Sequence, residues 1–248
     1  MNIEEIKIYI FAALAALVSL TVHEFAHGYA AYKMGDNTAK NLGRLTFNPI
    51  KHLDPVGLLC MIFFHIGWAK PVPVNARNFR NPKRGFAVVG LAGPLSNVLL
   101  GFFTAGAYLL VIALTKDTVF ESETAYNLAK NGILFLATFF SVNIGLGIFN
   151  LLPIPPFDGS RILNVILPPK LYFGIMRYER KIYLGVLVWL LVGDIVANAL
   201  RQIPFIAETP WLYFAVGIFS LSDIISAAIG AVMGLIMDIW QLIPFLKI

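Results

Sequence analysis

Long apolar stretches alternate with short polar segments along the whole chain. Stretches long enough to cross a hydrocarbon layer of about 30 Å lie near residues 8–31, 86–114, 132–152, 182–201 and 211–236. In lipid, only helices and closed barrels satisfy every backbone polar group. The pattern therefore predicts an all-α polytopic membrane protein with five or six transmembrane helices.

Two stretches leave the topology open. The run 55–68 is shorter than the others and is bounded by Pro55 and Pro71, so it forms either a short span or a re-entrant segment. The stretch 211–246 exceeds one crossing and contains Asp223 and Asp238. It therefore forms either a long tilted helix or a span followed by an interfacial helix.

The composition agrees with a protein embedded in a lipid bilayer. Apolar residues make up 58% and charged residues 13% of the 248 positions, and the mean hydropathy is +0.75. These values lie far from the averages of soluble domains. The length allows one helical bundle, so we expect a single domain over residues 1–248, with a core at about 8–165 and C-terminal helices at about 182–248.

Basic residues orient the predicted bundle. Nine of them lie between residues 33 and 84 against only Asp36 and Asp54, which places this segment in the cytoplasm and the N-terminus outside. The loop around residues 116–130 has no basic excess and falls outside, whereas residues 161–181 are basic and return to the cytoplasm. The net charge of +5 therefore reflects the topology of the bundle. The sequence contains no soluble domain on which basic residues cluster, so it does not predict a nucleic-acid partner.

The first apolar stretch contains the sequence HEFAH at residues 23–27. Four helical steps of about 100° return His27 to the face of His23, so both imidazoles can reach one metal ion. Glu24 lies beside that face, where it can act on a metal-bound water as in HExxH zinc proteases. The alternative is a pair of helix-packing histidines with a neighbouring acid, which would cost several kcal/mol in hydrocarbon unless their polar groups are satisfied.

Catalytic zinc usually takes three protein ligands, and Asp158 is the best candidate for the third. It stands in the sequence NLLPIPPFDG of residues 150–159, whose three prolines must end the preceding helix. The alternative is a proline-rich turn in which Asp158 only caps the helix beginning near Ser160. The single cysteine, Cys60, excludes an internal disulfide or a thiolate cluster, so zinc must rest on histidine and carboxylate.

The motifs together resemble those of the site-2 protease family of intramembrane zinc metalloproteases. HEFAH and NLLPIPPFDG carry the resemblance, and three further stretches are similar to those of short bacterial or archaeal members: residues 47–55, 67–74 and 93–97. It covers roughly residues 15–165. The resemblance implies regulated cleavage of membrane-protein substrates within or near their transmembrane segments, in a prokaryotic cell membrane, by a chain without PDZ or CBS domains.

The same resemblance implies roles for individual residues. His23, His27 and Asp158 would bind zinc, and Glu24 would be the general base. Asn150 would position the substrate or stabilise the oxyanion, and Asn97 maps to the asparagine of the GPxxN motif. The active site would lie towards the cytoplasmic face.

Two other classes and two local features remain as alternatives. A transporter or ion-handling protein also has broken helices and buried His and Asp, but it does not require Glu24, and the chain shows no internal repeat. A catalytically silent relative would not need Glu24 together with all three ligand positions. Residues 68–74 form either an extended edge for an unwound peptide or a membrane-surface loop. The Gly230–Gly234 pair marks either a homo-oligomer face or packing within the monomer.

Overall fold

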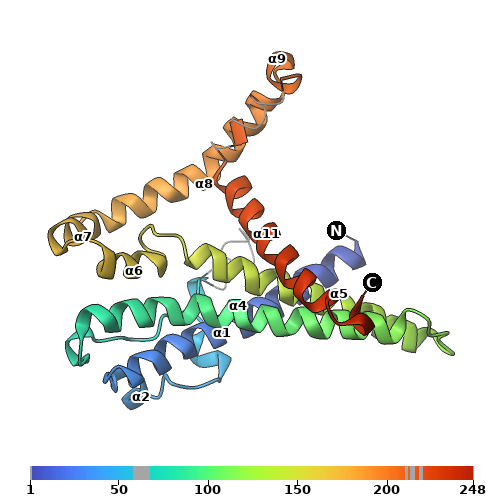
Figure 1. Ribbon diagram of the computed structural model, residues 1–248, viewed down its shortest axis with the longest axis horizontal. Helices are drawn as coiled ribbons and strands as arrows, with labels where there is room; N and C mark the ends of the chain where they lie inside the picture. The colour runs from blue at the N-terminus through green and yellow to red at the C-terminus, as the bar shows by residue number, and fades with distance from the viewer. Residues whose placement is uncertain (1, 58–67, 210–211, 213–215, 218–219, 248) are drawn as a thin grey trace.

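The computed structural model describes residues 2–57, 68–209, 212, 216–217 and 220–247, and the protein is all-helical over these residues (Figure 1). Its α-helices are α1 (Ile3–Lys33), α2 (Thr38–Asn41), α4 (Pro82–Thr115), α5 (Glu123–Asn150), α6 (Gly159–Ile166), α7 (Pro169–Met176), α8 (Glu179–Arg201), α9 (Pro204–Ala207) and α11 (Leu221–Gln241). Three 3₁₀ helices accompany them, namely η1 (Pro49–His52), η2 (Ala76–Asn78) and η3 (Pro244–Leu246).

Among the described residues, five helices are long and apolar enough to cross a membrane: α1, α4, α5, α8 and α11. The predicted polytopic all-α fold is therefore confirmed. Helices α1 and α4 begin before the predicted apolar stretches, at polar residues that cap them. Asn2 and Glu5 form a capping box at the start of α1, and the Asn81 side chain accepts a hydrogen bond from the N–H of Arg84 at the start of α4.

The two ambiguous stretches have different outcomes. Most of the run 55–68 falls in residues 58–67, outside the described part of the chain. In the last stretch, Ser220 caps the start of α11, which ends at Gln241 and is followed by the short η3. Over residues 220–247 the structure thus contains one helix long enough to span and a short 3₁₀ turn. A Cβ at Gly230 or Gly234 would meet no atom within 4 Å, so the described residues show no neighbouring helix packed on this pair.

Helices α1, α4 and α5 lie side by side and form the centre of the molecule (Figure 1). Helix α11 crosses α4 and α5, where Ala105, Phe140, Ile144 and Ile236 form a buried apolar cluster. Helix α8 contacts α11 and points away from the three central helices. The turn after α5 brings α6 back against α4, so residues 151–158 lie at the same end of the bundle as the HEFAH turn of α1 (Figure 1).

An extended segment, which we call the strap (residues 68–75), lies against α1. One end is fixed by an isolated bridge between Leu53 and Ala69, and the other by a hydrogen bond of 2.7 Å from the Asn75 N–H to the Asp36 carboxylate. Between them, the Val72 side chain packs over Gly28, where a Cβ would lie only 3.1 Å from Val72 Cγ1. The lack of a side chain at Gly28 therefore allows the strap to approach the HEFAH turn.

Candidate metal centre and catalytic site

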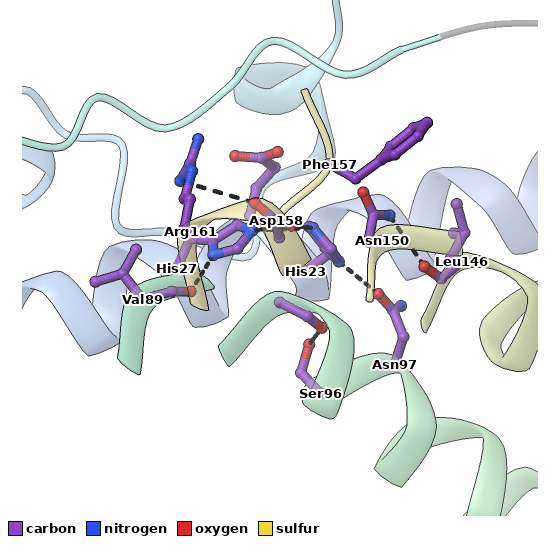
Figure 2. A network of polar contacts seen from close by, with 12 residues as sticks. His23, His27, Val89, Ser96, Asn97, Leu146, Asn150, Phe157, Asp158 and Arg161 are labelled. Carbon is purple, nitrogen blue, oxygen red and sulfur yellow. Dashed lines mark hydrogen bonds and ion pairs between the residues drawn. The ribbon is translucent and has the colours of Figure 1, made fainter. Parts of the chain in front are cut away.

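Three buried side chains converge on one point between α1 and the start of α6. The Nε2 atoms of His23 and His27 each lie 3.0 Å from Asp158 Oδ2 and 2.9 Å from one another (Figure 2). The two histidines come from successive turns of α1, as the HExxH spacing predicts. The structure therefore brings together the three residues that the sequence analysis selected as metal ligands.

Asp158 does not cap α6. It occupies the N-cap position of that helix but its side chain makes no capping hydrogen bond, so the capping alternative is wrong. The Oδ2 atom faces the two histidines, and Oδ1 lies 3.7 Å from the Arg161 guanidinium (Figure 2). Metal binding requires this carboxyl group in its ionised form.

The outer nitrogen of each histidine has a hydrogen-bond acceptor as its partner. His27 Nδ1 donates to the Val89 carbonyl oxygen at 2.7 Å, and His23 Nδ1 lies 2.6 Å from Asn97 Oδ1 (Figure 2). The Asn97 Nδ2 donates to the carbonyl oxygen of Ser19 at 3.1 Å, which favours this orientation of the amide. Both Nδ1 atoms therefore carry a proton, so in the neutral form of each imidazole the Nε2 lone pair is directed towards Asp158.

This arrangement fits a zinc ion. Two imidazole lone pairs and an ionised carboxylate oxygen meet within 3.0 Å, which is repulsive unless a cation lies among them. Ligands about 2.0–2.2 Å from a tetrahedral zinc stand roughly 3.3–3.6 Å apart, so a small outward movement of the three side chains would accommodate the ion. Two nitrogens and one oxygen suit zinc better than magnesium or calcium, which prefer oxygen ligands.

Gly93 on α4 leaves the space that the two imidazoles occupy. A Cβ at this position would lie 2.6 Å from both Nε2 and Cε1 of His23 and would also collide with Nε2 of His27. Ordinary van der Waals contact begins at 3.4 Å, so even one methyl group would have to displace both rings. The absence of a side chain at Gly93 is therefore part of the metal site.

Gly93→Ala is expected to weaken zinc binding at least tenfold, in the range of about 10–100-fold that follows from disturbing the partners of a ligand. The matched control is Gly132→Ala on α5, where an added Cβ meets nothing within 4 Å and should leave zinc binding unchanged. Competition with a chromophoric chelator on detergent-purified protein measures both affinities. Equal zinc affinity in the two variants would show that the space at Gly93 is not needed.

Glu24 is held by the strap. Its Oε2 atom accepts a hydrogen bond of 2.7 Å from the backbone N–H of Val72, and Oε1 accepts none from the described residues. A cavity of about 770 Å³ extends from His23 and Glu24 to the walls formed by α5 and α8, a volume within the usual range for ligand sites. One carboxylate oxygen is thus fixed while the other remains available for a water molecule.

Asn150 lines the same cavity, at the end of α5. Its Nδ2 donates to the carbonyl oxygen of Leu146 in its own helix at 3.0 Å (Figure 2). One of its two N–H hydrogens is therefore engaged and the other remains for a ligand. Among the described residues, Asn150 makes no hydrogen bond to His23, His27 or Asp158, whereas Asn97 contacts His23 directly.

Several partners in the site were not predicted from sequence. They include the Val89 carbonyl, the Val72 N–H and the Arg161 guanidinium. The first two are backbone groups that any residue type supplies, so the sequence carries no signal for them. Arg161 follows Asp158 by three positions, one helical turn, and this spacing could have indicated the ion pair.

A buried group of two histidines and an aspartate, next to a glutamate within HExxH, is the arrangement of a zinc metalloprotease, and the described residues include five helices long and apolar enough to span a membrane. The model of peptidase family M50 matches residues 11–192. The chain belongs to peptidase family M50, the site-2 protease family of zinc metalloproteases.

Relatives support the same assignment. The "Putative zinc metalloprotease YwhC" of Bacillus subtilis is 43% identical over 159 residues, which cover 64% of this chain and 70% of the relative. The "Putative zinc metalloprotease Rip2" of Mycolicibacterium smegmatis is 30% identical over 66% of this chain and 60% of the relative. A zinc metalloprotease of Methanocaldococcus jannaschii is 30% identical over 62% of this chain and 33% of the relative. No solved structure matches this chain at a significant level.

Proposed function

We propose that this protein cuts membrane-protein substrates at peptide bonds within or near their transmembrane segments. The observation that carries the proposal is the position of the metal-binding group. His23 and His27 lie within the apolar helix α1, packed between α4 and α5, and the adjoining cavity is lined by helices long enough to span a membrane. A substrate that reaches this cavity must itself be able to enter a membrane.

His23, His27 and Asp158 would hold the zinc ion. When bound, zinc supplies a water molecule of lowered pKa and polarises the scissile carbonyl. Glu24 would take the proton of the attacking water through Oε1 and pass it to the leaving amine. The remaining N–H of Asn150 would donate to the developing oxyanion, because Asn150 and Glu24 line the same cavity.

A helical substrate must be unwound before it can be cut, since its scissile amide is hydrogen-bonded and shielded. The strap borders the cavity through Trp68 and Ala69, which supports a role in receiving the unwound segment. Its inner N–H groups are already engaged, because Lys70 donates to the His52 carbonyl and Val72 donates to Glu24. A substrate strand that pairs with the Val72 N–H would therefore replace the Glu24 carboxylate as the acceptor of that hydrogen bond.

The orientation follows from charge. The basic segments 33–84 and 161–181 flank the end of α1 that carries His23 and His27. By the positive-inside rule we propose that this end lies at the cytoplasmic face of the membrane and the N-terminus outside. A short path then links the zinc site to cytoplasmic water, which hydrolysis needs.

The proposal is tested with the full chain in liposomes and a synthetic transmembrane peptide as probe, carrying a Gly-Pro pair in its apolar segment. Mass spectrometry of the products locates the cut. We expect cleavage within or next to the apolar segment and none by the Glu24→Gln variant. Cleavage confined to a soluble peptide, or equal cleavage by both proteins, would overturn the proposal.

Val72→Pro is expected to slow cleavage of the same probe by about 10–100-fold while zinc content stays unchanged. Proline lacks the N–H that holds Glu24, and a hydrogen bond to a charged group contributes about 1.5–3 kcal/mol. Val72 already precedes Pro73, so its backbone is restricted to extended conformations that proline also adopts. Val72→Ala keeps the N–H and serves as the control; equal rates in the two variants would count against this role of the strap.

A further inference from the structure

Asn143 is a fully buried amide in the middle of α5 that contacts neither the three metal-binding side chains nor the cavity. It belongs to a chain of hydrogen bonds that joins α5, α4 and α1. Asn143 Nδ2 donates to the Phe139 carbonyl at 2.8 Å, and Asn143 Oδ1 accepts from Asn97 Nδ2 at 3.0 Å. Asn97, also fully buried, faces His23 at the other end of this chain.

The direction of every hydrogen bond in this chain is determined. The Phe139 carbonyl can only accept, so Asn143 must present its oxygen to Asn97. The two N–H hydrogens of Asn97 then go to Asn143 and to the Ser19 carbonyl, which leaves Asn97 Oδ1 facing His23 Nδ1. An oxygen at that point requires a proton on Nδ1 and leaves the Nε2 lone pair free.

We propose that Asn143 is a positioning residue for His23, acting through Asn97, so that His23 binds zinc in the correct tautomer. A flipped Asn97 amide would present N–H groups to His23 Nδ1 and force the ring proton onto Nε2, where it blocks metal binding. Asn143 makes the flip unfavourable because its oxygen would then face the Asn97 oxygen. The proposal rests on the zinc site of the proposed function.

The competing explanation is that the two amides only hold α4 and α5 together in the membrane. The two roles differ in what they change. A structural role lowers the melting temperature and leaves the zinc affinity of the folded protein intact. A positioning role changes the zinc affinity, and it does so only while Asn97 is present.

The test is a double-mutant cycle of zinc affinity, with the metal alone as the probe and a chromophoric chelator as competitor. The variants are Asn143→Leu, Asn97→Ala and the combination of both. Thr104→Val is the matched control: it removes another buried polar group of α4, which bonds only the Leu100 carbonyl at 2.7 Å. Asn143→Ala and Asn97→Ser replace the first two variants where either fails to accumulate. The visible spectrum of the cobalt(II)-substituted protein reports on ligand geometry independently of activity.

We expect Asn143→Leu to raise the zinc dissociation constant by about 3- to 30-fold. This effect is smaller than the roughly 10–100-fold expected for loss of a direct outer partner such as Asn97, because Asn143 acts one contact further from the ligand. In the Asn97→Ala background it should add nothing, and Thr104→Val should bind zinc like the wild type. The cobalt spectrum should shift in Asn143→Leu and not in Thr104→Val.

Wild-type zinc affinity in Asn143→Leu would overturn the inference, whatever its melting temperature. So would losses that multiply in the double variant, because Asn143 would then not act through Asn97. With either of these results, a wild type that binds zinc and an Asn97→Ala variant that binds it more weakly would leave the zinc site of the proposed function intact. Only the inference about Asn143 would then fail. A wild type that binds no zinc overturns both.

Discussion

Glu24→Gln is expected to bind about one zinc per chain and to cut its substrate about 10²–10⁴-fold more slowly than the wild type. This is the range that general-base catalysis contributes. Glutamine has nearly the same shape as glutamate, and its amide oxygen can still accept the hydrogen bond from the Val72 N–H. It cannot take a proton from water. The change therefore removes the base and leaves the three metal-binding side chains in place.

Two measurements on the same preparation check this prediction. Metal analysis gives zinc per chain, and cleavage of the transmembrane peptide in liposomes gives the rate. Glu24→Asp is a useful companion, since it keeps the carboxylate but withdraws it by one methylene and should retain part of the activity. An active Glu24→Gln variant would exclude Glu24 as the base, and a zinc-free one would show that the change damages the metal site.

Asp158→Ala is expected to lose both zinc and cleavage. The two histidines would remain, but the carboxylate oxygen 3.0 Å from each of them would be gone, and the Arg161 guanidinium would face the vacated position without its partner. Loss of a ligand should weaken zinc binding by more than the roughly 10–100-fold that loss of an outer partner produces. Cleavage should fall to the level of metal-free protein.

Asp194→Ala provides the matched control for this variant. Asp194 accepts hydrogen bonds from Ser220 and Ser222, between α8 and α11, and makes none with the metal-binding group among the described residues. Its replacement should leave zinc per chain unchanged. If Asp158→Ala held as much zinc as Asp194→Ala, Asp158 would not be the third ligand, and the assignment of the site would be wrong.

The features that the sequence predicted are those set by local periodicity. Hydropathy over about 20 residues located the spans, because a helix must be apolar over its whole length to cross lipid. The four-residue spacing of His23 and His27 fixed their common face within one helix, whatever the rest of the fold. Asp158 followed from the chemistry of zinc, which needs a third ligand, and from the helix break that the prolines impose.

The features that sequence did not predict depend on contacts between distant segments. Val89 lies 62 positions from His27, and Val72 lies 48 positions from Glu24, and both contribute backbone atoms that every residue has. Gly93 acts through the absence of a side chain, which becomes visible only once α4 is packed against the two imidazoles. The sequence likewise could not show whether Asp158 caps α6 or binds the metal. The structure distinguishes the two roles because the side chain faces His23 and makes no capping hydrogen bond.

X-ray absorption at the zinc edge of the detergent-purified wild type tests the central claim most directly, because it reports the atoms bound to the metal. The account predicts two imidazole nitrogens and carboxylate or water oxygen at about 2.0–2.2 Å, with no sulfur. The imidazole signal should be lost or strongly reduced in His23→Ala. A sulfur shell at about 2.3 Å, or a shell without imidazole, would contradict the site built by His23, His27 and Asp158.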